Sequence, residues 1–264
     1  MTPDQVWDYQ VNYGLLLNLV VVLGLYSTVY FAFNGFEPTR KRLQKWRFSQ
    51  DKYPDQLIVD LEVLRLVRSV VICSMIDAAV LHLREQYGWF PLLTGDEYGV
   101  SALLKELFEQ PGILIATTVV LLLWADFHFY FTHRLLHTAW LFANIHSVHH
   151  QSKNPDAFSG LSFHWLEAGI YFSSLLGCAF IPMSLATFVA FRFGLLIAPI
   201  GHNSAGPLPH GQRFPQPFED HYLHHIVVTK NFASGLFPYG GIWDNLLGTA
   251  FVPIDYRKSD PKAD

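Results

Sequence analysis

Histidines are concentrated in one half of this 264-residue chain, at spacings that suit metal binding. Twelve of the 13 lie between His128 and His225. Eight form three clusters with members three or four positions apart: His133 and His137; His146, His149 and His150; and His221, His224 and His225. Residues at these spacings share one face of a helix, so each cluster should point its imidazoles in one direction. Neutral imidazole binds iron, zinc, copper or nickel, and eight donors suit two metal ions with three to five ligands each.

Six further residues are candidates for the same site. His202 lies where the last apolar segment ends and is a ninth candidate ligand. The other five are expected to orient the imidazoles or to line the pocket: Asp126, Tyr130, His128, His164 and Glu167. Asp126 and Tyr130 fall on the helical face of His133, whereas His128 is about 140° away from it.

The composition indicates a membrane protein that positions these clusters with helices. Only 15% of the residues are charged, against about a quarter in soluble domains, and the mean hydropathy is +0.22. Four apolar segments are candidates for crossing a membrane: 11–33, 66–83, 112–124, and 168–200 with a break at Pro182. The sequence therefore predicts an all-α integral membrane bundle of about four to five transmembrane helices. We expect a single domain, with N-terminal helices in 1–125 and the histidine clusters in 126–250.

The distribution of charge predicts how this bundle is oriented. Lys and Arg are enriched between Arg40 and Lys52, as is typical of cytoplasmic loops. The loop 85–110 is acidic, which suits the opposite side. Counting the crossings then places every histidine cluster at the cytosolic face. The chain must also turn between His137 and His146, because nine helical steps would set them about 180° apart.

Composition also excludes several classes of function. A net charge of −4 gives a nucleic-acid partner no basic surface to bind. Cys73 and Cys178 both lie in apolar segments, which rules out a disulfide framework or a cysteine zinc site. The chain has no HExxH, GxSxG, Walker or GxGxxG motif.

The histidine pattern resembles that of the fatty acid hydroxylase/sterol desaturase superfamily of membrane di-iron enzymes. The matching residues are Asp126, His133-Arg-Leu-Leu-His137, His146-Ser-Val-His149-His150, His221-Tyr-Leu-His224-His225 and the segment Trp243-Asp-Asn-Leu-Leu-Gly-Thr249. The stretch from Asn154 to Glu167 is similar to one in sterol C-5 desaturases.

This resemblance implies a chemistry and its cofactors. Two iron ions would activate O₂ as co-substrate, with zinc as their replacement in purified protein. An unactivated C–H bond of a membrane lipid (sterol, sphingoid, fatty acyl or related) would be hydroxylated or desaturated. Electrons would come from a reductase with a small cytochrome or a ferredoxin. The membrane would be the endoplasmic reticulum in a eukaryote or the inner membrane in a bacterium.

Two other enzyme or transport functions remain alternatives at this point. A membrane zinc hydrolase could use Glu167 as general base, although catalytic zinc usually keeps only three protein ligands. A divalent-metal transporter would hold its ligands near the midplane on broken helices. A membrane haem protein would need paired axial histidines, which crowded HxxHH clusters disfavour.

Overall fold

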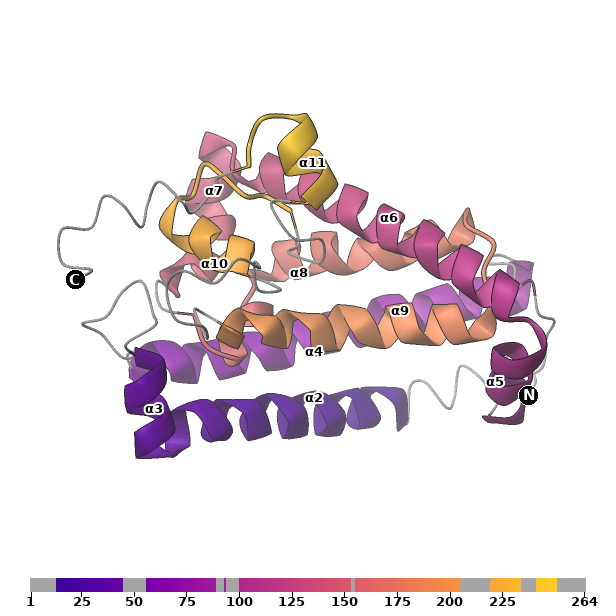
Figure 1. The fold of residues 1–264 in the computed structure, drawn as a ribbon, viewed down its shortest axis with the longest axis horizontal. Coiled ribbons are helices and arrows are strands. Elements are labelled where there is room, and N and C mark those ends of the chain that lie inside the picture. Colours follow the sequence, from indigo (N-terminus) through magenta and orange to yellow (C-terminus); the bar gives the residue numbers. More distant parts are fainter. Residues whose placement is uncertain are drawn as a thin grey trace.

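The computed structural model describes residues 13–44, 56–88, 93, 100–152, 155–204, 219–233 and 241–250, and every regular element within them is helical (Figure 1). The α-helices are α2 (Leu15–Tyr30), α3 (Glu37–Gln44), α4 (Gln56–Tyr87), α5 (Val100–Glu109), α6 (Pro111–Leu136), α7 (Ala139–Asn144), α8 (Trp165–Phe172), α9 (Leu185–Ile197), α10 (Glu219–Ile226) and α11 (Gly241–Leu246). Shorter 3-10 helices are η3 (His146–Gln151), η4 (Phe158–Leu161), η5 (Ser173–Ala179) and η6 (Ala198–Ser204), and η2 (Phe31–Gly35) is a π-helix. The all-α prediction is confirmed.

Among the described residues, three helices are long and apolar enough to cross a membrane: Leu15–Gly35, Gln56–Leu83 and Pro111–Leu136. A shorter apolar helix covers Leu185–Gly201, after a break that contains the predicted Pro182. These helices make the chain an integral membrane protein, as its composition predicts. Of the predicted first span, residues 11 and 12 lie outside the described residues.

The second and third spans are longer than the sequence predicted. The second begins at Gln56 rather than at residue 66, and Arg65 in the added part of the helix donates to the Val148 carbonyl and to the Gln151 side chain of η3. The third continues past Trp124 to Leu136 and carries His133 in its last turn. With 32 residues, α4 is about 48 Å long, well beyond the ~30 Å hydrocarbon core.

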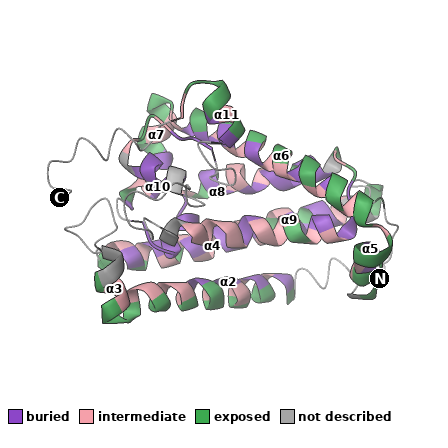
Figure 2. Cartoon of the chain, viewed as in Figure 1, coloured by how far each residue is buried: buried purple, intermediate pink, exposed green. Residues whose placement is uncertain are grey.

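Polar contacts join the long helices inside the bundle. The Tyr26 hydroxyl of α2 donates to the Leu196 carbonyl of α9 at 2.8 Å. Asp77 of α4 and Arg192 of α9 form a buried ion pair with an N–O distance of 2.6 Å. Buried residues face the interior of the bundle, while exposed positions recur along the outer faces of α2 and α6 (Figure 2).

The ends of the bundle differ in what they carry. Helices α3, α7 and α10 lie at one end and α5 lies at the other (Figure 1). The basic segment that contains Arg40 and Lys41 is therefore at the same end as the histidine clusters, as the crossing count predicted. That this end faces the cytosol stays a prediction.

Candidate metal centre

Eight histidines meet at the C-terminal end of α6, and they come from α6 and its C-cap residue His137, from η3 and from α10. They form two adjoining groups, the group of five and the group of three, in each of which the potential ligand atoms lie within 4.8 Å of one another. The group of five contains His133, His137, His146, His150 and His224, and the group of three contains His149, His221 and His225. The two groups touch, since the His150 and His225 ring centroids are 4.6 Å apart.

Each HxxHH motif is divided between the two groups. In the motif on η3, His146 and His150 belong to the group of five and His149 to the group of three. The motif on α10 is divided in the opposite sense, with only its middle residue, His224, in the group of five. The expectation that each cluster points in one direction is therefore wrong. Residues four apart lie on nearly the same face of a helix, whereas adjacent residues are separated by about 100°. The first and third histidines of each motif therefore share a group, and the middle one turns toward the neighbouring group.

The nitrogen geometry of the group of five fits a bound cation. His133 Nδ1 donates to the Phe232 carbonyl at 2.8 Å, and His146 Nδ1 contacts Glu167 Oε1 at 2.7 Å. With the ring protons on Nδ1, both Nε2 atoms carry lone pairs, yet they face each other at 3.1 Å. Two lone pairs form no hydrogen bond. Two nitrogens bound about 2.1 Å from one cation at a right angle lie about 3.0 Å apart, so a metal ion between them accounts for the arrangement.

Other nitrogen pairs repeat this separation in both groups. His137 and His224 have Nε2 atoms 3.0 Å apart, and His149 and His225 have Nε2 atoms 3.1 Å apart. His224 Nδ1 donates to the Lys230 carbonyl at 2.6 Å, which leaves its Nε2 free of a proton. The donor set and its spacing therefore fit metal ions in both groups.

Burial keeps these imidazoles neutral and ready to bind metal. Desolvation lowers the pKa of His137 to about 2, with further contributions from His133 and His150. It lowers the pKa of His146 and of His224 as well, again helped by neighbouring histidines. A protonated ring would place an unpaired charge among like charges in a buried site.

Glu167 lies directly against His146, at the position expected of a residue that orients an imidazole, and its supporting role stays a prediction. Its side chain is 3% exposed, and burial raises the pKa of this carboxyl group. A carboxylate that accepts the Nδ1 proton of a ligating histidine fixes the ring's tautomer and orientation.

The N-terminal half of α4 forms hydrogen bonds with η3, with η4, with the residue that follows η3 and with a residue just after η4. Arg65 donates to the Gln151 side chain at 2.9 Å, Arg68 donates to the Phe163 carbonyl, and Ser69 donates to the Leu161 carbonyl at 2.8 Å. Glu62 accepts a hydrogen bond from Ser152. The sequence prediction missed these residues, although Glu62, Arg65 and Ser69 follow a helical period along one face of an otherwise apolar segment.

The remaining predicted residues are placed around the centre rather than in it. Asp126 is buried near Gly241 and Asp244, and the Tyr130 hydroxyl is 2.9 Å from Thr249 Oγ1, so both pack against the C-terminal segment. His164 caps the N-terminus of α8 by accepting from the Leu166 N–H. The side chain of His202, within η6, lies outside the described residues.

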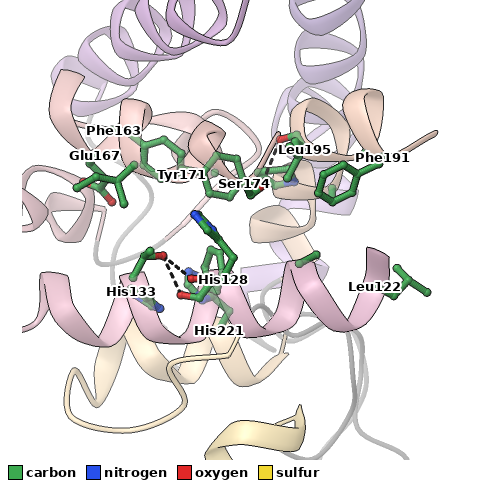
Figure 3. Close-up of a pocket in the computed structure, with 18 of the residues that line it drawn as sticks. Leu122, His128, His133, Phe163, Glu167, Tyr171, Ser174, Phe191, Leu195 and His221 are labelled. Atoms are coloured by element: carbon green, nitrogen blue, oxygen red, sulfur yellow. Dashed lines mark hydrogen bonds between the residues drawn. The ribbon is translucent and has the colours of Figure 1, made fainter. Parts of the chain in front are cut away.

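An apolar cavity of about 250 Å³ begins at the histidines and follows α6 (Figure 3). His133, His146, His149 and His221 close one end, so both groups border it. On α6 the lining extends from His133 back to Thr118, a rise of about 22 Å. Leu121, Leu122 and the α9 residues Phe191 and Leu195 are among the apolar residues that line it.

Comparison with known proteins agrees with this centre. The family model for fatty acid hydroxylases matches residues 118–249, half of the chain, and includes all eight grouped histidines. This chain belongs to the fatty acid hydroxylase family. The resemblance seen in the sequence is thereby confirmed.

Two relatives of this fatty acid hydroxylase family member are plant proteins. It is 34% identical over 146 residues to very-long-chain aldehyde decarbonylase GL1-10 of Oryza sativa subsp. japonica, covering 52% of this chain and 47% of the relative. It is 31% identical over 134 residues to methylsterol monooxygenase 1-3 of Arabidopsis thaliana, covering 48% of this chain and 46% of the relative. The chain spans about half the length of these relatives. No solved structure matches it.

Proposed function

We propose that this protein oxidises an unactivated C–H bond of a membrane lipid, by hydroxylation or desaturation, with O₂ at a pair of histidine-bound iron ions. One observation carries the proposal: facing, unprotonated imidazole nitrogens 3.1 Å apart form the end wall of an apolar cavity. Family membership and the names of the relatives, an aldehyde decarbonylase and methylsterol monooxygenases, support a lipid-modifying reaction.

The residues of the chain have separable tasks in this reaction. The two histidine groups would hold the iron, which when bound would supply the chemistry that activates O₂ and removes hydrogen from carbon. Leu121, Phe191 and Leu195 hold the lipid and exclude water from the reacting carbon. The Phe232 carbonyl and Glu167 keep the ring protons of His133 and His146 on Nδ1, which leaves both Nε2 atoms free for metal.

The geometry argues against the alternatives. A zinc hydrolase would use about three protein ligands and an open position, whereas the group of five alone exceeds that number. A transporter would place its ligands near the membrane midplane on broken helices. Here the ligands gather at one end of the bundle (Figure 1), and His133 lies in the last turn of an unbroken helix.

Electrons must reach the centre from a separate protein, and we place their entry at a second hollow. Its lining includes His137, Phe142 and Phe232 and the exposed Arg134. His137 and His150 are half-buried, unlike the other six grouped histidines. A reductase-linked cytochrome or a ferredoxin on the cytosolic side would dock there, in the endoplasmic reticulum or a bacterial inner membrane.

The test is O₂-dependent lipid oxidation by the full chain in lipid nanodiscs. Iron-loaded protein receives membrane lipid, a reduced ferredoxin and heavy-isotope O₂, and products are read by mass spectrometry. Hydroxylation adds a labelled oxygen, whereas desaturation removes two hydrogens and adds none. His149→Ala should yield neither product, and His82→Ala, a histidine of α4 outside both groups, should match the wild type. Equal product from His149→Ala, or none from the wild type, would contradict the proposal.

A further inference from the structure

The cavity along α6 is lined mostly by apolar side chains, but polar side chains also lie part-way along it. His128 of α6 and Ser174 of η5 both line it, between the histidine groups and Thr118 (Figure 3). Neither belongs to the two metal-binding groups. The cavity therefore offers hydrogen-bonding groups at a place where a pure hydrocarbon would use none.

The hydrogen bonds of His128 define its tautomer. His128 Nε2 is 3.1 Å from Ser173 Oγ, and that hydroxyl already donates its one proton to the Ile170 carbonyl at 2.7 Å. Ser173 Oγ must therefore accept from His128, which puts the ring proton on Nε2. The other ring nitrogen, Nδ1, is left as a hydrogen-bond acceptor.

Ser174 supplies the complementary group. Its side chain is 2% exposed, and its Oγ has no hydrogen-bond partner among the described residues. The Ser174 carbonyl accepts from Trp124 Nε1 at 2.9 Å, which fixes the backbone at this position. A buried hydroxyl without a partner is destabilising, and a ligand group in the cavity that bonds to it would offset part of that cost.

We propose that His128 and Ser174 together bind a hydroxyl group of the lipid and so determine which carbon meets the metal centre. This inference rests on the proposed function and adds the substrate class: an amphipathic lipid with a hydroxyl group enclosed in the cavity. A hydroxyl donates to His128 Nδ1 and accepts from the Ser174 hydroxyl. His133 is five residues further along α6, a rise of about 7.5 Å, so a hydroxyl held at His128 would lie about one and a half helical turns from the histidine groups.

The chemistry of the lining favours a hydroxyl over other lipid groups. Among the described residues that line the cavity there is no Lys or Arg, so a carboxylate would be buried without a cation. A carbonyl oxygen accepts but does not donate, and it would leave His128 Nδ1 without a partner. A neutral hydroxyl satisfies both side chains.

Binding of a matched pair of probes tests the inference without turnover. Purified protein in nanodiscs is titrated with radiolabelled dodecanol and, separately, with radiolabelled dodecane, which lacks the hydroxyl. The variant Gly194→Leu sets the background, because a side chain at Gly194 enters open space on the cavity wall. Ser174→Ala and His128→Phe each remove one proposed partner, and Thr118→Val removes a hydroxyl at the far end of the same cavity.

We expect Ser174→Ala and His128→Phe each to bind dodecanol about tenfold more weakly than the wild type, as the loss of one hydrogen bond predicts. Dodecane binding should stay unchanged in both, and Thr118→Val should bind both probes as the wild type does. Ser174→Ala should fold at least as stably as the wild type, because its hydroxyl has no protein partner to lose. Unchanged metal content in both variants confirms an intact centre.

Three results would overturn the inference. These are dodecanol binding unaffected by both substitutions, an equal loss in Thr118→Val, and no saturable binding above the Gly194→Leu background. Failure of the proposed function is a separate result. The wild type could bind dodecanol more tightly than dodecane and yet form no oxidised lipid. That result would support the hydroxyl-binding site and contradict the proposed reaction.

Discussion

The two histidine groups lie side by side but differ in ligand number and in surroundings. The group of five has more donors than a metal ion with an open position needs, and two of its members, His137 and His150, are only half-buried. The group of three is fully buried, and its members His149 and His221 line the apolar cavity. An ion held by three protein ligands keeps open positions. We therefore expect firmer metal retention in the group of five and more open coordination positions in the group of three.

Removing one ligand from each group should have the largest and most unequal effect. His225→Ala leaves two histidines in the group of three, so metal content should fall from about two ions per chain to about one, with loss of turnover. His150→Ala leaves four in the group of five and should retain about two ions. Elemental analysis of both variants measures this. Equal metal loss in the two would remove the distinction between the groups.

Glu167→Gln should weaken metal binding in the group of five without emptying it. The substitution replaces the carboxyl group that contacts His146 Nδ1, and loss of such a partner lowers metal affinity by about 10–100-fold. Competition with an iron chelator measures the change. Glu106→Gln is the control, since Glu106 caps α9 by accepting from Leu185 and Ala186. The control should lose stability but keep its affinity for iron, and unchanged affinity in Glu167→Gln would contradict the role given to Glu167.

Filling the cavity should separate substrate binding from metal binding. Gly194→Leu adds a side chain into open space on the cavity wall, so lipid turnover should fall by about tenfold while metal content stays the same. Gly169→Leu makes the same change in α8, also into open space, at a residue that does not line the cavity. Product formation and metal content are measured for both. Equal turnover by the two variants would mean that the cavity does not hold the substrate.

The smallest effect is expected from loss of a hydrogen bond between α4 and η4, beside the group of three. Ser69 donates to the Leu161 carbonyl of η4, and the nearby Phe163 ring centroid is 5.2 Å from that of His149. Ser69→Ala should lower the free energy of unfolding by about 1 kcal/mol. Thermal unfolding in detergent measures the change, with Thr28→Val as control because Thr28 bonds only within its own helix. An equal loss of stability in Thr28→Val would show that the hydrogen bond to η4 stabilises the protein no more than a bond within one helix does.

The sequence was sufficient to predict the helical membrane fold and the eight grouped histidines, because both depend on local spacing. The turn between His137 and His146 was predicted correctly, since an unbroken helix would separate these ligands. The division of each HxxHH motif between two groups was not predictable, because it depends on how η3 and α10 pack against α6. The hydrogen bonds of Arg65 and Ser69 were missed for the same reason, since their partners lie more than 80 positions away in the chain.

The number and kind of metal ions in the purified full chain test the central claim most directly. Protein isolated in mild detergent and analysed by elemental analysis should contain about two iron ions per chain, one for each histidine group. Two zinc ions would support two metal sites and call for iron replacement before activity is measured. A single tightly bound ion, or metal that exchanges freely, would contradict the two-metal account.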